Sequence, residues 1–357
     1  MSPVSVVSVT SKFLITPASA VTMWSNVFIL TMAAAATASC LRFQNLVSFG
    51  DSLTDEGRLN YMFINGELPP VGELLPPSNN TASGGQSWPR FVSQKANVKS
   101  LNYAIGGAVC SNAVTPRFIE FFGDGPMPAV LDNEVPTFLA DLEHDLYDGG
   151  RTAVNTVYSL WIGSNDLGLG GFLTDEQVPG KTLSDYVECN WQVLDEVYKT
   201  GGRHFILLTV FPYDQSPLYN LPSQGGLESP TSNPTKAETN MTMYYTKARQ
   251  QSTSVNTMLK YGAGFQAMVQ KRWPGATLTV LDAHALMSDV IASPDGYLEA
   301  PANTTGVYAL CTDQTGTDCE FDDNPPEGFV FYDDLHPSAR MGKHTSVPTV
   351  QHEANKR

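Results

Sequence analysis

The stretch Asn45–Asn60, NLVSFGDSLTDEGRLN, decides the fold of this chain. Its first part, Asn45–Phe49, is short and mainly apolar, which predicts a buried strand. Gly50 permits a sharp exit from that strand, and a helix can begin a few residues later. Ser52 therefore stands just past the carboxyl end of a predicted strand, the place where α/β folds carry their reactive groups.

Four more runs resemble this strand, and helical patterns lie between them. The strand candidates are Leu101–Ala104, Thr156–Ile162, His204–Val210 and Thr277–Leu281, and the helix candidates are Val135–Tyr147, Leu183–Thr200 and Tyr244–Arg272. The alternation predicts an α/β fold with a parallel sheet. Pro69–Ser87 and Pro212–Lys236 are rich in Pro, Gly, Ser and Asn, which predicts long surface loops. Because the strand series runs across both, we expect one domain.

The composition limits the classes of partner. The chain has 357 residues, 42% of them hydrophobic, and a net charge of -15. That length supports one sizeable core, and an acidic surface repels the phosphate backbone, so we expect no nucleic-acid partner. Met23–Cys40 is apolar, ends in small residues and is too short to span a membrane. We expect residues 1–38 to be a leader cleaved after Ala36-Thr37-Ala38, although Ala18-Ser19-Ala20 leaves the start and the cut open.

The cysteines and glycosylation motifs agree with export. The chain has no C-x-x-C pair, which removes the commonest zinc and redox patterns. Cys311 with Cys319 is the first predicted disulfide and Cys110 with Cys189 the second, with free buried thiols as the alternative and Cys40 left over. N-x-[ST] motifs stand at Asn79, Asn240 and Asn303. Together these features predict a secreted, extracellular glycoprotein.

A second motif, Asp333-Asp334-Leu335-His336-Pro337, supplies a base and its partner. A serine hydroxyl is a weak nucleophile unless an imidazole takes its proton, and a carboxylate must orient that imidazole. Asp333 and His336 are three residues apart, so one turn of chain can bring them together. The alternatives are a helix-capping role for Ser52 and an acidic surface turn with an unrelated histidine.

Two further segments could supply an oxyanion hole, which needs hydrogen-bond donors aimed at a tetrahedral oxygen. Asn102–Ala108 ends a strand in Gly106-Gly107, where a backbone N–H can point into a site. Gly163-Ser164-Asn165-Asp166 follows another strand, and Asn165 offers a side-chain amide. A tight turn and a loop cap are the structural alternatives.

These four blocks, in this order, resemble the SGNH (GDSL) hydrolase family over about residues 43–340. The resemblance implies a three-layer α/β/α sandwich around a central, mostly parallel five-stranded sheet of flavodoxin-like type, as a single domain over residues 39–343. It also implies Ser52 as nucleophile, His336 as base and Asp333 as its orienting carboxylate. The implied oxyanion donors are the backbone amides of Ser52 and Gly107 and the side chain of Asn165.

Phe49–Asn60 and the later Ser87-Trp88 look most similar to secreted fungal acetylesterases of carbohydrate esterase family sixteen. This resemblance implies removal of acetyl groups from plant cell-wall carbohydrate through an acyl-serine, and we expect a monomer without metal or organic cofactor. One alternative is a GDSL lipase or lysophospholipase acting on longer acyl esters. The other is a non-catalytic carbohydrate-binding protein on the same fold.

The carboxyl-terminal end departs from the family pattern. Family members continue past the D-x-x-H-P motif into a packed helix, whereas Ser338–Arg357 is polar, contains Pro348 and lacks an apolar stripe. We therefore expect residues 344–357 to be a disordered tail, which would loosen the loop that aims His336.

Other chemistry-bearing residues receive structural roles. His144, His204 and His284 lack metal-ligand spacing. Asp51, Asp166 and Asp282 could orient His336 in place of Asp333, but none has the D-x-x-H spacing. Positions in the core or the cleft wall are expected for Trp88, Trp161 and Trp191, and Trp88 is the best cleft candidate of the three.

Overall fold

The computed structural model describes residues 6–10 and 43–354, apart from residues 124, 229, 231, 234–235 and 313–317. One sheet with the strand order β1-β6-β5-β4-β2-β3 forms the centre. Its strands are β1 (Val6–Thr10), β2 (Asn45–Gly50), β3 (Lys99–Asn102), β4 (Thr156–Trp161), β5 (His204–Leu208) and β6 (Thr277–Leu281). The last five are parallel to one another, as the sequence predicts, and β1 pairs antiparallel with the edge strand β6.

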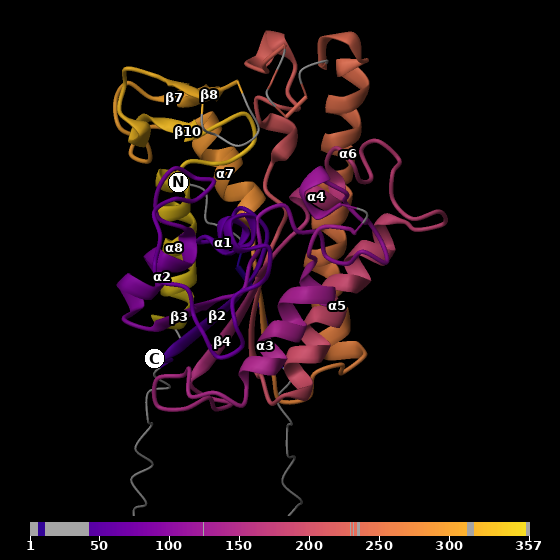
Figure 1. Cartoon of the computed structure of the whole chain (residues 1–357), viewed down its shortest axis with the longest axis vertical. Helices are drawn as coiled ribbons and strands as arrows, with labels where there is room; N and C mark the ends of the chain where they lie inside the picture. Colours follow the sequence, from indigo (N-terminus) through magenta and orange to yellow (C-terminus); the bar gives the residue numbers. More distant parts are fainter. Residues whose placement is uncertain are drawn as a thin grey trace, which may run out of the picture.

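Helices cover both faces of this sheet and make the three-layer α/β/α sandwich (Figure 1). They are α1 (Arg58–Asn65), α2 (Trp88–Ala96), α3 (Val135–Asp141), α4 (Ser164–Leu167), α5 (Leu183–Lys199), α6 (Met241–Gly264), α7 (Ala283–Ala292) and α8 (Ala339–Ala354). The contacts of α2 with α8 and of α7 with α8 form one layer, and those of α3 with α5 and α5 with α6 form the other. Every residue of β2 and β4 is buried between them, which explains their nearly continuous apolar sequence.

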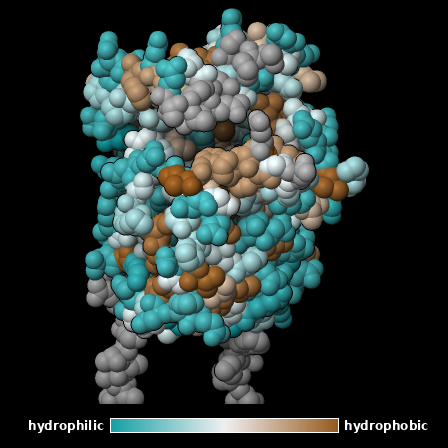
Figure 2. All heavy atoms as spheres, viewed as in Figure 1, coloured by the Kyte–Doolittle hydropathy of each residue, from teal (hydrophilic) through white to brown (hydrophobic). Residues whose placement is uncertain are grey.

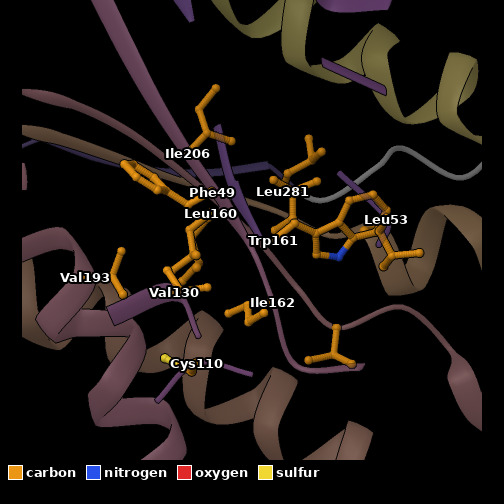
Figure 3. Close-up of a cluster of buried hydrophobic side chains, with 14 of the residues drawn as sticks. Phe49, Leu53, Cys110, Val130, Leu160, Trp161, Ile162, Val193, Ile206 and Leu281 are labelled. Carbon is orange, nitrogen blue, oxygen red and sulfur yellow. The ribbon is translucent and has the colours of Figure 1, made fainter. Parts of the chain in front are cut away.

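The apolar core lies on both sides of the sheet (Figure 3). Phe49 of β2 packs edge-on against Phe138 of α3, on the α3 and α5 side. Trp161 of β4 packs against Trp88 of α2 on the opposite side. Alternate residues of a strand point to opposite faces, so each central strand contributes to both halves of the core.

A small β-rich segment stands beside one end of the sandwich (Figure 1). It contains β7 (Asn303–Val307) paired with β10 (Phe329–Phe331), and β8 (Ala309–Cys311) paired with β9 (Cys319–Phe321). The Cys311–Cys319 disulfide joins β8 to β9, and the Cys110–Cys189 disulfide ties the segment after β3 to α5. Both predicted disulfides are confirmed.

The carboxyl-terminal end corrects the expectation of a disordered tail. Residues up to Ala354 form α8, which packs against α2. Met341, Thr345 and Ser346 are buried, and Lys95 of α2 donates a hydrogen bond to the Ser346 hydroxyl. At residues 344–346 the prediction was wrong because it looked for large apolar residues, whereas α8 buries small polar side chains there.

Three other expectations need correction or fall partly outside the described residues. Pro212–Asn220 is largely buried, with Tyr213 and Leu218 each at most 2% exposed, whereas residues 221–228 are partly or fully exposed as a surface loop. Trp88 is 1% exposed in the core and donates to the Thr54 hydroxyl, so it lines no sugar cleft. The predicted leader lies outside the described residues except for β1, a strand that the sequence analysis did not predict.

Candidate active site

The turn after β2 presents Ser52 at the carboxyl end of the sheet. A Cβ at Gly50 would lie 2.3 Å from the carbonyl oxygen of Trp161, so only glycine allows this approach to β4. Beyond it, the backbone N–H groups of Thr54 and Asp55 donate to the Asp51 carbonyl, and the Leu53 N–H donates to the Asp51 carboxylate. This tight turn fixes the direction of the Ser52 side chain.

A continuous hydrogen-bonded chain joins Ser52, His336 and Asp333. The Ser52 hydroxyl lies 2.7 Å from His336 Nε2, and His336 Nδ1 lies 2.7 Å from Asp333 Oδ2. The second carboxylate oxygen of Asp333 accepts from the backbone N–H groups of Leu335 and His336. The structure thus brings together the three residues that the two distant motifs supply, with the carboxylate locked by the loop that carries the histidine.

The pKa shifts of His336 and Asp333 are those expected of a base and its counter-ion. Burial lowers the pKa of His336, but the carboxylate of Asp333 more than offsets it, so the pKa stands above its ordinary value. Burial raises the pKa of Asp333, but the positive charge of His336 and the hydrogen bonds from the loop place it below its ordinary value. Asp333 is therefore ionised when His336 begins to titrate.

Gly107 and Asn165 lie side by side and share one cation. Gly107 has φ +79°, and Arg117 Nη1 donates to both its carbonyl oxygen and Asn165 Oδ1, each at 2.8 Å. Asn165 Nδ2 donates to the Ala108 carbonyl at 2.9 Å, which leaves its second N–H available. In the part of the chain that the structure describes, the backbone N–H groups of Ser52 and Gly107 donate to no other group.

A buried carboxylate fixes the two chain segments that carry Ser52 and Gly107. Glu134 is 1% exposed, and its two oxygens accept from the backbone N–H groups of Gly50 and Ile105, each at 3.0 Å. Beside it, Asp55 accepts from the backbone N–H of Gly106 at 2.8 Å. The segments that carry Ser52 and Gly107 are thus joined through hydrogen bonds to buried acidic side chains.

Two more buried carboxylates lie around the site. Burial raises the pKa of Asp51 to about 6, against hydrogen bonds that lower it, and one of its oxygens has no partner among the described residues. Burial raises the pKa of Asp166 to about 7, although it accepts from Thr115 and from the Cys110 backbone. Neither carboxylate hydrogen-bonds the His336 ring, where Asp333 is found instead.

The loop that carries His336 is fastened to Pro212–Lys236. The Leu218 backbone N–H donates to the Asp334 carbonyl at 2.7 Å. The Asp334 carboxylate accepts from both the backbone N–H and the hydroxyl of Ser232, each at 3.0 Å. Lys236 closes the segment, since its buried ammonium donates to the Pro217 and Asn220 carbonyls.

The end of the sheet where β2 and β4 lead into α1 and α4 faces a hollow in the surface (Figure 2). The hollow lies between the β7 to β10 segment and the region of α1 and α4, and brown apolar side chains border it. Within the described ranges, no group of three His, Cys, Asp or Glu side chains is placed to hold a metal ion.

Arg117 and Glu134 are the site residues that sequence reasoning missed. Neither lies in one of the four motif blocks, and each contacts residues of two different blocks. Asp166 stood in the G-x-N-D block, but nothing in the sequence revealed that it accepts from Cys110 and Thr115.

Comparisons with known proteins identify the family. Residues 46–345 match the model of the GDSL-like lipase/acylhydrolase family. An acetylesterase of Hypocrea jecorina is 40% identical over 297 residues, which are 83% of this chain and 84% of that protein. A GDSL esterase/lipase of Arabidopsis thaliana is 25% identical over 85% of this chain and 88% of its own. A solved structure, the acetylxylan esterase Axe2 of Geobacillus stearothermophilus, aligns with a TM-score of 0.35 at 16% identity, covering 87% of this chain and 93% of its own. With its family match over most of its length, the chain belongs to the GDSL-like lipase/acylhydrolase family.

Proposed function

We propose that this protein is a serine esterase that removes short acyl groups, in particular O-acetyl groups, from carbohydrate. The observation that carries the catalytic part is the hydrogen-bonded chain from Ser52 through His336 to Asp333, with both links at 2.7 Å. That geometry lets a serine hydroxyl lose its proton as it attacks a carbonyl carbon.

The reaction proceeds through an acyl-Ser52. His336 Nε2 takes the hydroxyl proton while the Ser52 oxygen bonds to the ester carbonyl carbon. The resulting oxyanion receives hydrogen bonds from the Ser52 and Gly107 backbone amides and from Asn165 Nδ2. His336 then protonates the departing sugar alcohol, and a water molecule, deprotonated by His336, releases the acid and restores Ser52.

The preference for a short acyl group is supported by the surroundings of Gly107. A Cβ at Gly107 would lie 2.5 Å from Met127 Cε, so the Met127 side chain packs against Gly107, whose backbone N–H is a proposed oxyanion donor. Met127 is 3% exposed and leaves little room on that side. The 40% identical acetylesterase of Hypocrea jecorina supports acetyl as the group removed.

Met127→Ala tests the acyl preference. We expect the ratio of octanoyl to acetyl p-nitrophenyl ester hydrolysis to rise in this variant, because the shorter side chain vacates space beside the acyl group. Met243→Ala, at an exposed position of α6, is the matched control and should leave the ratio unchanged. A ratio that is the same in Met127→Ala and wild type would contradict the assignment of Met127 to the acyl-binding side.

A preference for longer acyl chains is the second candidate, favoured by exposed aromatic residues. Phe63 of α1 and Phe121 pack edge to face while 44% and 48% exposed, and Phe118 next to Arg117 is 62% exposed. An exposed apolar group of this kind could receive a hydrocarbon chain. Higher kcat/KM for octanoyl than for acetyl p-nitrophenyl ester in the wild-type protein would favour this candidate.

Release of acetate from acetylated xylan tests the carbohydrate part. Wild-type protein should release acetate, and Ser52→Ala should bind the polymer without releasing it. Binding without release by both proteins would instead favour a non-catalytic carbohydrate-binding role. Secretion is part of the proposal and rests on the fungal relative and the predicted leader. In the described residues, no helix has the length and apolar character needed to cross a bilayer.

A further inference from the structure

Lys236 is a buried cation that the acyl-transfer steps do not use. It is 1% exposed and lies outside the four motif blocks. Its Nζ donates to the Pro217 carbonyl at 3.0 Å and to the Asn220 carbonyl at 2.8 Å. Burying an ammonium costs hydration free energy, which such acceptors offset. Lys236 thus fastens both ends of one turn, residues 217–220, from a position further along the chain.

The 217–220 turn contacts both halves of the candidate active site. On one side, the Leu218 backbone N–H donates at 2.7 Å to the Asp334 carbonyl, in the loop that carries the base. On the other side, the Tyr219 hydroxyl accepts at 3.1 Å from the backbone N–H of Leu169, just after the short helix α4 that carries Asn165. Leu218 and Tyr219 are each at most 4% exposed. The turn therefore links the base to an oxyanion donor through buried contacts.

The charge of Lys236 acts on the same loop. Among the described residues, the charged side chain whose field reaches the ammonium is Asp334, and the two attract each other. The Asp334 carboxylate also accepts from the backbone N–H and the hydroxyl of Ser232, each at 3.0 Å. A neutral, apolar side chain at position 236 would lose this attraction as well as the hydrogen bonds to the turn. Lys236 therefore stabilises the base loop both through the turn and directly.

We propose that Lys236 is a positioning residue for ester hydrolysis, because it holds the turn that places His336 and Asn165 beside Ser52. This inference rests on the esterase function proposed above. His336 Nε2 must stay within hydrogen-bond distance of the Ser52 hydroxyl, and a displacement of about 1 Å can lower a rate by about 100-fold. A looser turn therefore lowers kcat. KM should change little, because the ammonium is occupied by the turn and does not bind the substrate.

Protonation of Lys236 controls the strength of these contacts. Burial lowers its pKa to about 8, although the attraction of Asp334 opposes that shift. The neutral amine is a weaker donor to the two carbonyls than the ammonium is. In the unfolded chain the lysine stays protonated up to about pH 10.4, so the Lys236 contribution to the free energy of unfolding rises between about pH 8 and about pH 10. A loss of kcat through Lys236 in this range is therefore not a loss of folding.

Steady-state hydrolysis of p-nitrophenyl acetate by the full chain tests this proposal. Lys236→Met keeps most of the side-chain length without the charge, and Lys236→Gln offers a neutral donor instead. Arg151→Met is the matched control, because Arg151 donates to the Thr200 carbonyl at 2.9 Å at the opposite end of the sheet, where β4 and β5 begin. kcat and KM are measured at about pH 7 and about pH 9, on either side of the Lys236 pKa. Urea titrations at both pH values establish that each protein is folded.

We expect Lys236→Met to lower kcat about fivefold at pH 7 with KM within about twofold of the wild type, and Lys236→Gln to recover part of that loss. The ratio of kcat at pH 9 to kcat at pH 7 should be about threefold lower in the wild type than in either variant, because only the wild type loses a proton at this position. Arg151→Met should keep the wild-type kcat and ratio. An unchanged kcat in folded Lys236→Met, an equal loss in Arg151→Met, a rise in KM alone, or the same ratio in all four proteins would each overturn the proposal.

A measurement that needs no turnover separates this proposal from the esterase proposal. The proton between His336 Nδ1 and Asp333, which lie 2.7 Å apart, should give a downfield proton NMR line. We expect this line to shift or broaden in Lys236→Met and to stay unchanged in Arg151→Met. An unchanged line in folded Lys236→Met would overturn the positioning role. A wild type without hydrolytic activity in which the line still depends on Lys236 would overturn the esterase proposal instead. If Lys236→Met does not fold, Lys236→Gln takes its place in each comparison.

Discussion

The two halves of the candidate active site are held in the fold by different means. On the Ser52 and Gly107 half, Glu134 is 1% exposed and receives two backbone N–H groups, and Arg117 bridges Gly107 and Asn165. On the His336 half, the Leu218 backbone N–H donates to the Asp334 carbonyl, and the Asp334 carboxylate accepts from the exposed Ser232. Buried ionisable side chains thus fix the oxyanion half, while the loop that carries the base is tethered partly at the surface. We expect substitutions on the Ser52 and Gly107 half to change the free energy of unfolding and kcat strongly. Substitutions around the His336 loop should change both only slightly, unless they remove His336 itself.

Removal of the base should give the largest effect. His336→Gln keeps a polar side chain of similar reach but cannot take the Ser52 proton, so kcat/KM for p-nitrophenyl acetate should fall by about 10³-fold or more. The urea unfolding curve, measured in parallel, should stay close to that of the wild type. A loss below tenfold in a folded variant would mean that another group activates the serine.

Buried acids in the first half should make stability depend on pH. The pKa of Asp166 is raised to about 7, so the folded state keeps a proton that the unfolded chain releases near pH 4. The stabilisation by this proton is complete below the pKa that Asp166 has in the unfolded chain. It is lost as pH rises through the pKa that Asp166 has in the folded protein. The asparagine side chain of the Asp166→Asn variant cannot ionise. Between pH 4 and pH 8 the free energy of unfolding should therefore fall by about 3 kcal/mol less in the variant than in the wild type. Urea titrations at the two pH values measure the difference, and equal falls in variant and wild type would show that Asp166 is not proton-linked to folding.

The shared cation should affect the chemical step more than substrate binding. Arg117→Met removes the donor that holds the Asn165 amide and the Gly107 carbonyl, so both oxyanion donors become less well oriented. We expect kcat to fall about tenfold with little change in KM, less than the loss of a direct oxyanion donor. Arg117→Lys should recover part of kcat, because an ammonium can still donate to one of the two oxygens. A rise in KM at constant kcat would place Arg117 in substrate binding instead.

The tether of the His336 half should give the smallest effect. Ser232→Ala removes the hydroxyl donor to Asp334 but keeps the backbone N–H donor, so the free energy of unfolding should change by less than about 1 kcal/mol. Activity on p-nitrophenyl acetate should fall less than about threefold. A tenfold loss of kcat would remove the contrast between the two halves, because it would make the His336 loop as sensitive as the oxyanion side.

The sequence predicted the parts of this molecule that depend on short, local patterns. Four of the five parallel strands read as apolar runs, whereas β3 (KSLN) was predicted two residues late, as Leu101–Ala104. The Thr182–Asp185 capping box marks the start of α5 where the helix was predicted. The residues of the candidate site stood in motifs at strand ends, and the topology of a parallel sheet brings those ends to one edge.

The remaining features depend on contacts that no local pattern reveals. Glu134 accepts from backbone N–H groups and Arg117 donates partly to a backbone carbonyl, and a backbone partner cannot be recognised from the residue type at its position. Trp88 stood in a Gly- and Ser-rich neighbourhood, yet its ring is needed between α2 and β4. The helix α8 buries small polar residues, which an apolar periodicity does not detect.

The most direct test of the account is covalent. Wild-type protein and Ser52→Ala are each treated with a fluorophosphonate, assayed on p-nitrophenyl acetate and analysed by peptide mass spectrometry. We expect one adduct, on Ser52 of the wild type, and a loss of at least about 10³-fold in the hydrolysis rate of Ser52→Ala. An undiminished rate in the variant, or an adduct on another residue that abolishes activity, would show that Ser52 is not the nucleophile.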